Sequence, residues 1–314
     1  MVACLSVVSA APRARRGAAR HACPVAGSGR LPSVWIWGPH VAAVSAVVLV
    51  GVAYVAVVRI FGGPEGGPGG PRRRHAAFAA ALVLSAVFLT WPVADLAQRS
   101  LLVRMAQQTI LLLAVPPLAL LGLPRRLVDA MTRPAVLDWA ARSLTRPAVA
   151  TVLFNIGVLV VYLPPVMNTT VRSWPARAGV DLTLLLAGVI MWVPALRVLP
   201  GTGQLRPTGR AGYLMIQSVI PSFASLVFIF ARHPLYSAFD PSSIGITTLV
   251  DQQLAGALAK VASLAVLIGA AATLLWRSHQ IEERGGDPDP LTWDDVEREL
   301  RRLERRQRPT DSTT

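Results

Sequence analysis

Seven apolar stretches of about 20 residues or more run along the chain, and they limit the folds open to it. A helix rises ~1.5 Å per residue, so each stretch is long enough to cross the ~30 Å hydrocarbon core of a bilayer. In that core every backbone N–H and C=O must be paired within the protein, which favours helices. We therefore predict an all-α, polytopic helical membrane bundle with about seven transmembrane helices. The predicted spans are residues 34–60, 75–96, 101–123, 147–167, 176–199, 211–231 and 245–276.

The composition agrees with this fold class and divides the chain into three parts. Hydrophobic residues make up 53% of the chain and charged residues 15%, whereas soluble domains carry about 25% charged residues. Residues 1–33 form an Ala/Arg-rich tail that we predict to be disordered, and residues 34–276 form the membrane domain. Residues 277–314 are predicted to be a tail with a short amphipathic helix at 291–306, because four apolar side chains recur there among charged ones. These are Leu291, Val296, Leu300 and Leu303.

The basic residues predict the orientation of the bundle. The chain has 31 Lys and Arg against 17 Asp and Glu, but the arginines lie in short loops between apolar stretches, which argues for membrane topology and against a nucleic-acid partner. Twelve arginines lie in three alternate loops and eight in the C-terminal tail, against four in the opposite loops and five in the N-terminal tail. The positive-inside rule then places the N-terminus outside and the C-terminus in the cytoplasm. The Ala, Arg, Gly and Pro bias indicates the cell membrane of a high-GC bacterium.

Polar side chains inside the spans are the candidate functional residues, because each is costly in lipid unless it is paired or hydrated. Arg104, Gln107 and Gln108 have spacings i, i+3 and i+4, so they share one helix face. The predicted topology places Arg104 and groups from other spans at one depth, in the outer half of the membrane. The full set of candidates is Arg104, Gln107, Gln108, Tyr162, Asp181, His233, Asp251, Gln252 and Gln253.

The sequence shows no pattern of an ordinary enzyme. It has no Ser-His-Asp or Cys-His set, no phosphate-binding loop and no pair of histidines at metal-ligand spacing. We predict that the protein is not an enzyme. His21 and Cys23 in the N-terminal tail are a minor alternative as ligands of a soft metal, although Cys4 and Cys23 form no recognisable motif.

Several motifs resemble the CtaG-type cytochrome c oxidase assembly family, over roughly residues 91–299. They are Met105-Ala106-Gln107, the run Leu111 to Leu118 with Gly122-Leu123-Pro124, His233-Pro234-Leu235-Tyr236, Asp251 to Gly256, and the tail Trp293 to Glu299. This family comprises polytopic proteins implicated in maturing the copper B centre of haem-copper oxidases. The resemblance implies an assembly factor, copper as the metal that it handles, and oxidase subunits as partners besides membrane lipids.

The chain departs from the family pattern at the histidines. The family motif His-Met-x-Gln-His corresponds to Arg104 through Gln108, its His-x-Pro to Tyr162-Leu163-Pro164, and a further histidine to Asp181. Imidazole ligands for copper are thus missing from the spans, and we predict no stoichiometric copper in the membrane domain. We predict instead that Arg104 pairs with Asp181, Asp251 or both. The methionines Met105, Met167, Met191 and Met215 are interpreted as packing residues, with thioether ligation as the alternative.

Two functions from different classes remain open. The first is a membrane-embedded assembly factor that acts by binding an oxidase subunit. The second is a transporter for copper or another small solute, in which Asp181, Asp251 and Lys260 would line a path. A seven-span sensor is a weaker third hypothesis. The phenotype separates the first two, because loss of an assembly factor lowers oxidase activity without changing solute uptake.

Overall fold

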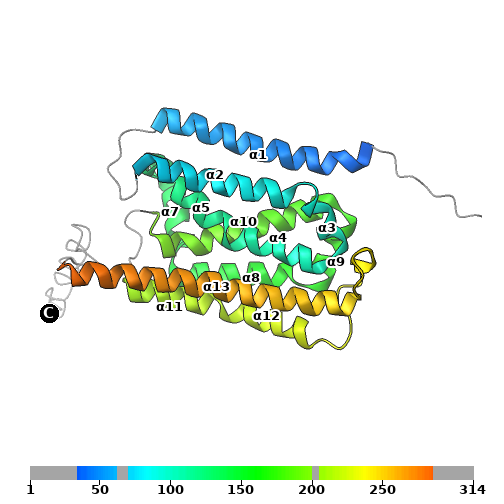
Figure 1. Ribbon diagram of the computed structural model, residues 1–314. Helices are drawn as coiled ribbons and strands as arrows, with labels where there is room; N and C mark the ends of the chain where they lie inside the picture. The colour runs from blue at the N-terminus through cyan, green and yellow to red at the C-terminus, as the bar shows by residue number, and fades with distance from the viewer. Residues whose placement is uncertain (1–33, 62–69, 200–204, 286–314) are drawn as a thin grey trace, which may run out of the picture.

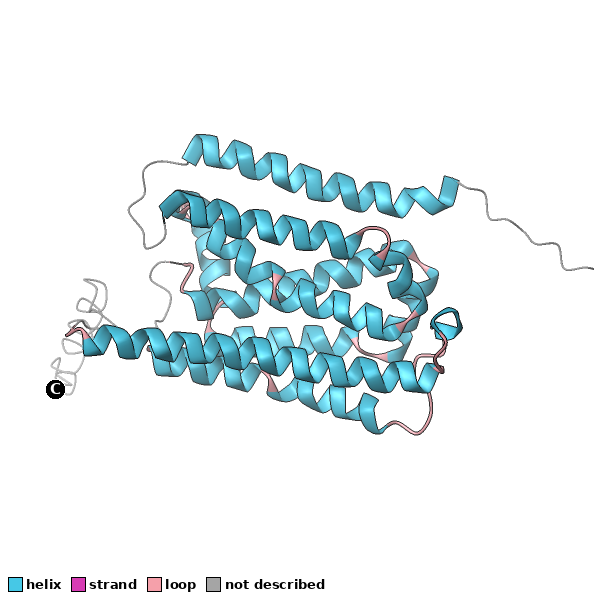
Figure 2. Ribbon diagram, in the orientation of Figure 1, coloured by secondary structure: helices cyan, strands magenta, loops and turns pink. Residues whose placement is uncertain are grey.

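The computed structural model describes residues 34–61, 70–199 and 205–285, and this part of the chain is helical without any strand (Figure 2). The predicted disordered tail at 1–33 and the predicted amphipathic helix at 291–306 lie outside the described residues. The helices are α1 (Val34–Phe61), α2 (Gly70–Leu89), α3 (Val93–Arg99), α4 (Leu101–Leu113), α5 (Val115–Gly122), α6 (Arg125–Met131), α7 (Ala135–Leu144), α8 (Pro147–Val161), α9 (Pro164–Arg172), α10 (Trp174–Leu196), α11 (Pro207–Gln217), α12 (Val219–Phe230), the 3₁₀ helix η1 (Pro241–Ile244) and α13 (Thr248–Glu283).

The helices that could cross a membrane agree with the predicted fold class. Five are long and apolar enough by themselves, and the number rises to seven if each of two bent helix pairs is counted as one span. The five are Val41–Phe61, Leu101–Gly122, Trp174–Leu196, Pro207–Phe230 and Thr248–Glu283. The bent pairs are Pro71–Leu89 with Val93–Arg99, at 48°, and Val136–Leu144 with Pro147–Val161, at 75°. The prediction of an all-α bundle is confirmed.

Proline explains where two predicted spans are interrupted. The predicted span 101–123 divides into α4 and α5 at Ala114, directly before Val115-Pro116-Pro117. Proline has no N–H to donate and its ring crowds the preceding turn. The predicted span 147–167 is wrong at its end, since α8 stops at Val161 and α9 begins with Pro164 and Pro165 in its first turn. At 15 residues, or about 22 Å, α8 is shorter than the ~30 Å hydrocarbon core.

The last helix is longer than predicted. The apolar stretch ends at Trp276, but α13 continues to Glu283 and has 36 residues. This corresponds to about 54 Å, well beyond the ~30 Å needed to cross hydrocarbon. Its final turns carry Arg277, His279, Glu282 and Glu283, and His279 lies 3.1 Å from Glu283. The end of α13 therefore projects past the apolar part of the bundle.

The core lies among α4, α8, α10, α11, α12 and α13, whereas α1 lies at the edge of the bundle (Figure 1). Large buried side chains such as Phe154, Leu184 and Leu214 fill this core. Gly188 lets α10 approach α4, because a Cβ there would lie 2.5 Å from the carbonyl oxygen of Leu112. Such small residues allow close helix packing in membranes, where apolar side chains gain little from leaving lipid.

The arginine-rich loops gather at one end of the bundle. Figure 1 shows the end of α1, the beginning of α2, helix α7 and the end of α13 at this end. Arg197, at the end of α10, also lies here and has a left-handed backbone conformation. Its Nη2 donates to the carbonyl of Leu205 at 2.6 Å. We call this the basic end. The opposite end, formed by α3, α9, η1 and the beginning of α13, is called the acidic-pair end, for the buried carboxylates Asp181 and Asp251 described next.

Candidate functional site

A buried ion pair links α4 to α10 near the acidic-pair end. Arg104 has only 1% of its surface exposed, and its Nη2 lies 3.0 Å from Oδ1 of Asp181. Nη1 donates to Oε1 of Gln107 at 3.0 Å and lies 3.4 Å from Oδ2 of Asp181. The predicted pair with Asp181 therefore forms, and Gln107 supports it from one turn along the same helix.

Asp251 caps the N-terminus of α4. Its carboxylate accepts hydrogen bonds at the beginning of α4, from Ser100 Oγ at 2.7 Å, Leu101 N at 2.6 Å and Leu102 N at 3.2 Å. The first N–H groups of a helix have no partner within the helix and carry partial positive charge, so a buried carboxylate satisfies them well. Of the two partners predicted for Arg104, Asp181 is the one that forms the pair, and the oxygens of Asp251 accept hydrogen bonds at the α4 N-terminus instead.

Gln252 and Gln253 hold the loop between α12 and α13. Oε1 of Gln252, which is buried, accepts from Leu235 N at 2.7 Å, and Nε2 of Gln253 donates to the carbonyl of Ala231 at 3.3 Å. Tyr236 of the same loop donates a hydrogen bond to the carbonyl of Tyr162. The two glutamines therefore hold the backbone of this loop at Leu235 and Ala231.

Tyr162 lies at the break between α8 and α9. Its carbonyl accepts a hydrogen bond from the hydroxyl of buried Tyr236 at 2.6 Å, and its ring meets Phe228 edge to face at 6.1 Å. Tyr162 thus connects the loop of the acidic-pair end with the break between α8 and α9.

Neither Gln108 nor His233 forms a hydrogen bond with the Arg104–Asp181 ion pair. Gln108 is fully buried and its Nε2 donates to Sδ of Met167 at 3.8 Å. His233 is exposed in the loop after α12, and no hydrogen bond or ion pair joins it to another described residue. The candidate set therefore contains an ion-pair centre, a helix cap and loop anchors, with His233 outside them.

A small cavity reaches the ion pair from the side of α1. Its volume is about 250 Å³, and its polar lining consists of Gln107, Arg177 and Asp181. Trp174 and Ala178 of α10 and three alanines of α1 make up much of the remaining wall. Two buried polar atoms near this level, Nε of Arg104 and Oε1 of Gln108, accept or donate no hydrogen bond among the described residues.

These residues do not fit copper held by imidazole. The positions at which the resemblance puts histidines hold Arg104, Gln108, Tyr162 and Asp181, and the guanidinium of Arg104 already neutralises the carboxylate. A cation at this point would be repelled by Arg104, which stays charged. In the described residues no three His, Cys, Asp or Glu side chains are grouped to hold a metal. Met105, Met167 and Met191 are buried in the core, and Met215 is 52% exposed.

Sequence reasoning missed a second polar contact deeper in the bundle. Nδ2 of Asn155 on α8 lies 3.3 Å from Oε1 of Gln217 on α11, whose Nε2 donates to Thr151 Oγ1 at 3.2 Å. Asn155 and Gln217 are both buried. The signal for this contact was an isolated amide within each of two apolar stretches, since interhelical amide bonds are a usual way to satisfy such groups.

Comparison with protein-family models identifies the chain. Residues 52–280 match the model of the cytochrome c oxidase caa3 assembly factor (Caa3_CtaG). The match begins earlier than the resemblance at residues 91–299 and ends before the tail motif Trp293 to Glu299. No curated protein and no solved structure matches the chain. Since the matched residues cover well over half of the chain, this protein belongs to the Caa3_CtaG family of cytochrome c oxidase assembly factors.

Proposed function

We propose that this protein assists cytochrome c oxidase assembly by binding an oxidase subunit at its acidic-pair end, without holding copper on ligands in its membrane domain. The observation that carries the proposal is the Arg104–Asp181 ion pair at positions where the resemblance implies histidines. The 250 Å³ cavity beside it offers Arg177 and Asp181 to a polar group of a partner. Copper B maturation would then be served through the partner subunit.

The transporter alternative has less support. Its path would need Asp251 as a free carboxylate, but that side chain is buried and accepts three hydrogen bonds from the beginning of α4. Neither the cavity at the ion pair nor the groove between α1 and α2 is lined by Asp251 or Lys260. Of the three side chains in the transporter hypothesis, only Asp181 lines either of these two cavities.

Co-purification with copper analysis tests the proposed function. The tagged protein, lacking residues 1–30 and expressed in its native membrane, is expected to bring down oxidase subunit I and to carry substoichiometric copper. Ala178→Phe should lower the recovery of subunit I, because Ala178 lines the cavity. Leu186→Phe is the matched control, since Leu186 lies on the same helix, is 53% exposed and does not line the cavity.

Two results would contradict this proposal. One copper per chain, retained after mild chelation, would restore the methionines as ligands. A deletion strain that loses solute uptake while keeping full oxidase activity would favour the transporter.

The proposal also fixes an orientation, with the acidic-pair end outside and the basic end in the cytoplasm, as the positive-inside rule requires. Single cysteines can test it after Cys4 and Cys23 are replaced by Ser. Ser237 is exposed at the acidic-pair end and Asp129 at the basic end. An impermeant thiol reagent added to intact cells should label Ser237→Cys and spare Asp129→Cys. The reverse pattern would show that the bundle is inverted.

A further inference from the structure

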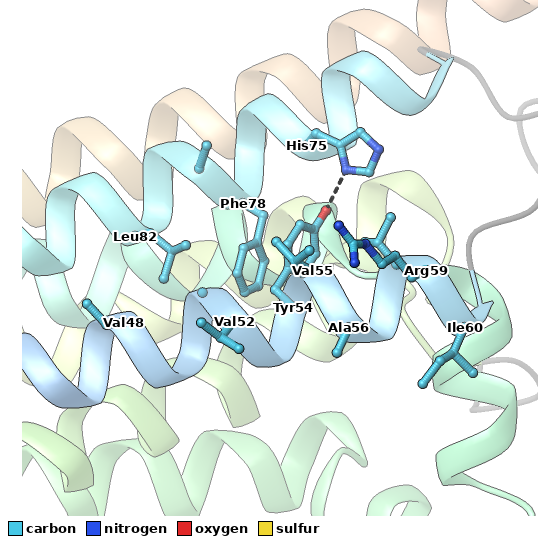
Figure 3. A pocket seen from close by; sticks show the side chains of 13 residues that line it. Val48, Val52, Tyr54, Val55, Ala56, Arg59, Ile60, His75, Phe78 and Leu82 are labelled. Atoms are coloured by element: carbon cyan, nitrogen blue, oxygen red, sulfur yellow. Dashed lines mark hydrogen bonds between the residues drawn. The ribbon is translucent and has the colours of Figure 1, made fainter.

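A lateral groove of about 1070 Å³ separates α1 from α2 (Figure 3). Its volume lies just above the ~300–1,000 Å³ usual for ligand pockets. Val48, Val52 and Val55 line it from α1, and Phe78 and Leu82 line it from α2. Because it lies at the edge of the bundle beside the outermost helix, it opens toward lipid, and an apolar chain is the occupant that suits its walls.

The inner wall of the groove is held in place by Tyr54. Its ring stacks on Phe78 with centroids 3.7 Å apart, and its hydroxyl donates to the carbonyl of Gly122 at 3.0 Å. The same hydroxyl lies 3.0 Å from Nδ1 of His75. No side chain of the part of α1 from Val41 to Phe61 is buried. Tyr54 thus links α1 to α2 and to Gly122 through three contacts at the side of the groove.

The length of the groove corresponds to one leaflet of the membrane. Its lining on α1 runs from Val48 to Ile60, which is about 18 Å of helix. Half of the ~30 Å hydrocarbon core is about 15 Å. A transmembrane helix from a partner would need a groove that continues across both leaflets. A lipid acyl chain needs only the length that is present.

The groove ends among basic side chains. Arg59 and His75 line it at the basic end, and both are exposed. Arg72 and Arg73, at the beginning of α2, are exposed at the same end. Basic pockets between transmembrane helices on the cytoplasmic side suit anionic lipid head groups.

We propose that the groove between α1 and α2 is a binding site for one anionic phospholipid, with an acyl chain along Val48, Val52 and Leu82 and the phosphate at Arg59 and His75. This site lies at the opposite end of the bundle from the Arg104–Asp181 pair. It does not depend on how the protein assists the oxidase.

Native mass spectrometry of the full chain in mild detergent tests the site. Titrated with phosphatidylglycerol, the protein should bind one lipid that survives collisional activation, whereas phosphatidylcholine should dissociate. Arg59→Gln should weaken phosphatidylglycerol binding about fivefold, the effect of one basic side chain near a membrane surface. Arg133→Gln is the matched control, because Arg133 is exposed near the basic end and does not line the groove.

A second pair of variants tests the apolar part. Ala79→Phe should block the bound lipid, since Ala79 lines the groove, whereas Ala76→Phe on the same helix should leave binding unchanged. Equal binding of the two lipids would overturn the proposal. Equal losses in Arg59→Gln and Arg133→Gln would do the same, by showing that lipid binds to general surface charge.

Discussion

Replacing Arg104 by Ala should lower the free energy of unfolding by about 3–5 kcal/mol, because it leaves the buried carboxylate of Asp181 without its counter-ion. Arg104 is 1% exposed and lies 3.0 Å from Asp181, so its loss leaves the carboxylate without its ion-pair partner in a largely buried site. Gln107 would lose its donor as well. The effect should appear in unfolding titrations of the detergent-solubilised protein followed by circular dichroism.

The double replacement Arg104→Gln with Asp181→Asn is expected to cost less than either single change. Each single variant leaves one charge buried and unpaired, whereas the double variant leaves two neutral amides that can bond to each other. A double-mutant cycle measures this coupling directly, and contacting residues commonly couple by about 0.5–3 kcal/mol. Additive losses in the cycle would show that the two side chains do not stabilise each other in the membrane.

The sequence predicted a buried carboxylate partner for Arg104 but left Asp181 and Asp251 open as that partner. Helical spacing puts Arg104 and Gln107 on one face, and the cost of a lone guanidinium in lipid demands a carboxylate at the same depth. The hydropathy pattern places both Asp181 and Asp251 at the depth of Arg104 in the membrane. The choice between them depends on which helix lies beside α4 at the level of Arg104, and no residue pattern encodes that lateral arrangement.

Asp251 illustrates what the sequence could not supply. It lies in the first turn of α13, and packing of α13 against α4 brings its carboxylate to the first turn of α4 rather than one turn further along. Ser100, the residue before α4, completes the site by donating to Asp251 and accepting from Val103 N at 3.3 Å. A Ser before a helix is recognisable as a cap. Its other partner, Asp251, lies 151 residues away along the chain, so only the fold reveals this contact.

The helix breaks were predictable in part. The sequence contains the runs Val115-Pro116-Pro117 and Leu163-Pro164-Pro165, and each pair of prolines favours a kink or break in a helix. Whether the chain bends or turns back after such a break depends on tertiary packing. At Ala114 the chain continues as α5 within one span, whereas after Val161 it leaves α8 for the separate helix α9.

Asp251→Ala should destabilise the protein by about 3–5 kcal/mol, because two backbone N–H groups and the Ser100 hydroxyl would lose their acceptor in a buried site. The carboxylate is fully buried, so water cannot readily replace it. Ser100→Ala removes one of its three donors and should cost about 1 kcal/mol. Asp251→Asn should fall between them, since one oxygen remains but the amide N–H would face a backbone donor.

A comparison with Asp129→Ala separates the loss of a helix cap from a general effect of lost charge. The carboxylate of Asp129 is exposed at the basic end. Asp129→Ala should leave the free energy of unfolding within about 0.5 kcal/mol of the unaltered protein. Because Arg104 N bonds to the carbonyl of Ser100 at 3.1 Å, an unravelled first turn would also displace the guanidinium from Asp181. The losses from Asp251→Ala and Arg104→Ala should therefore sum to more than the loss in the double variant. Strict additivity of the two, or equal stability of Asp251→Ala and Asp129→Ala, would show that Asp251 does not position α4.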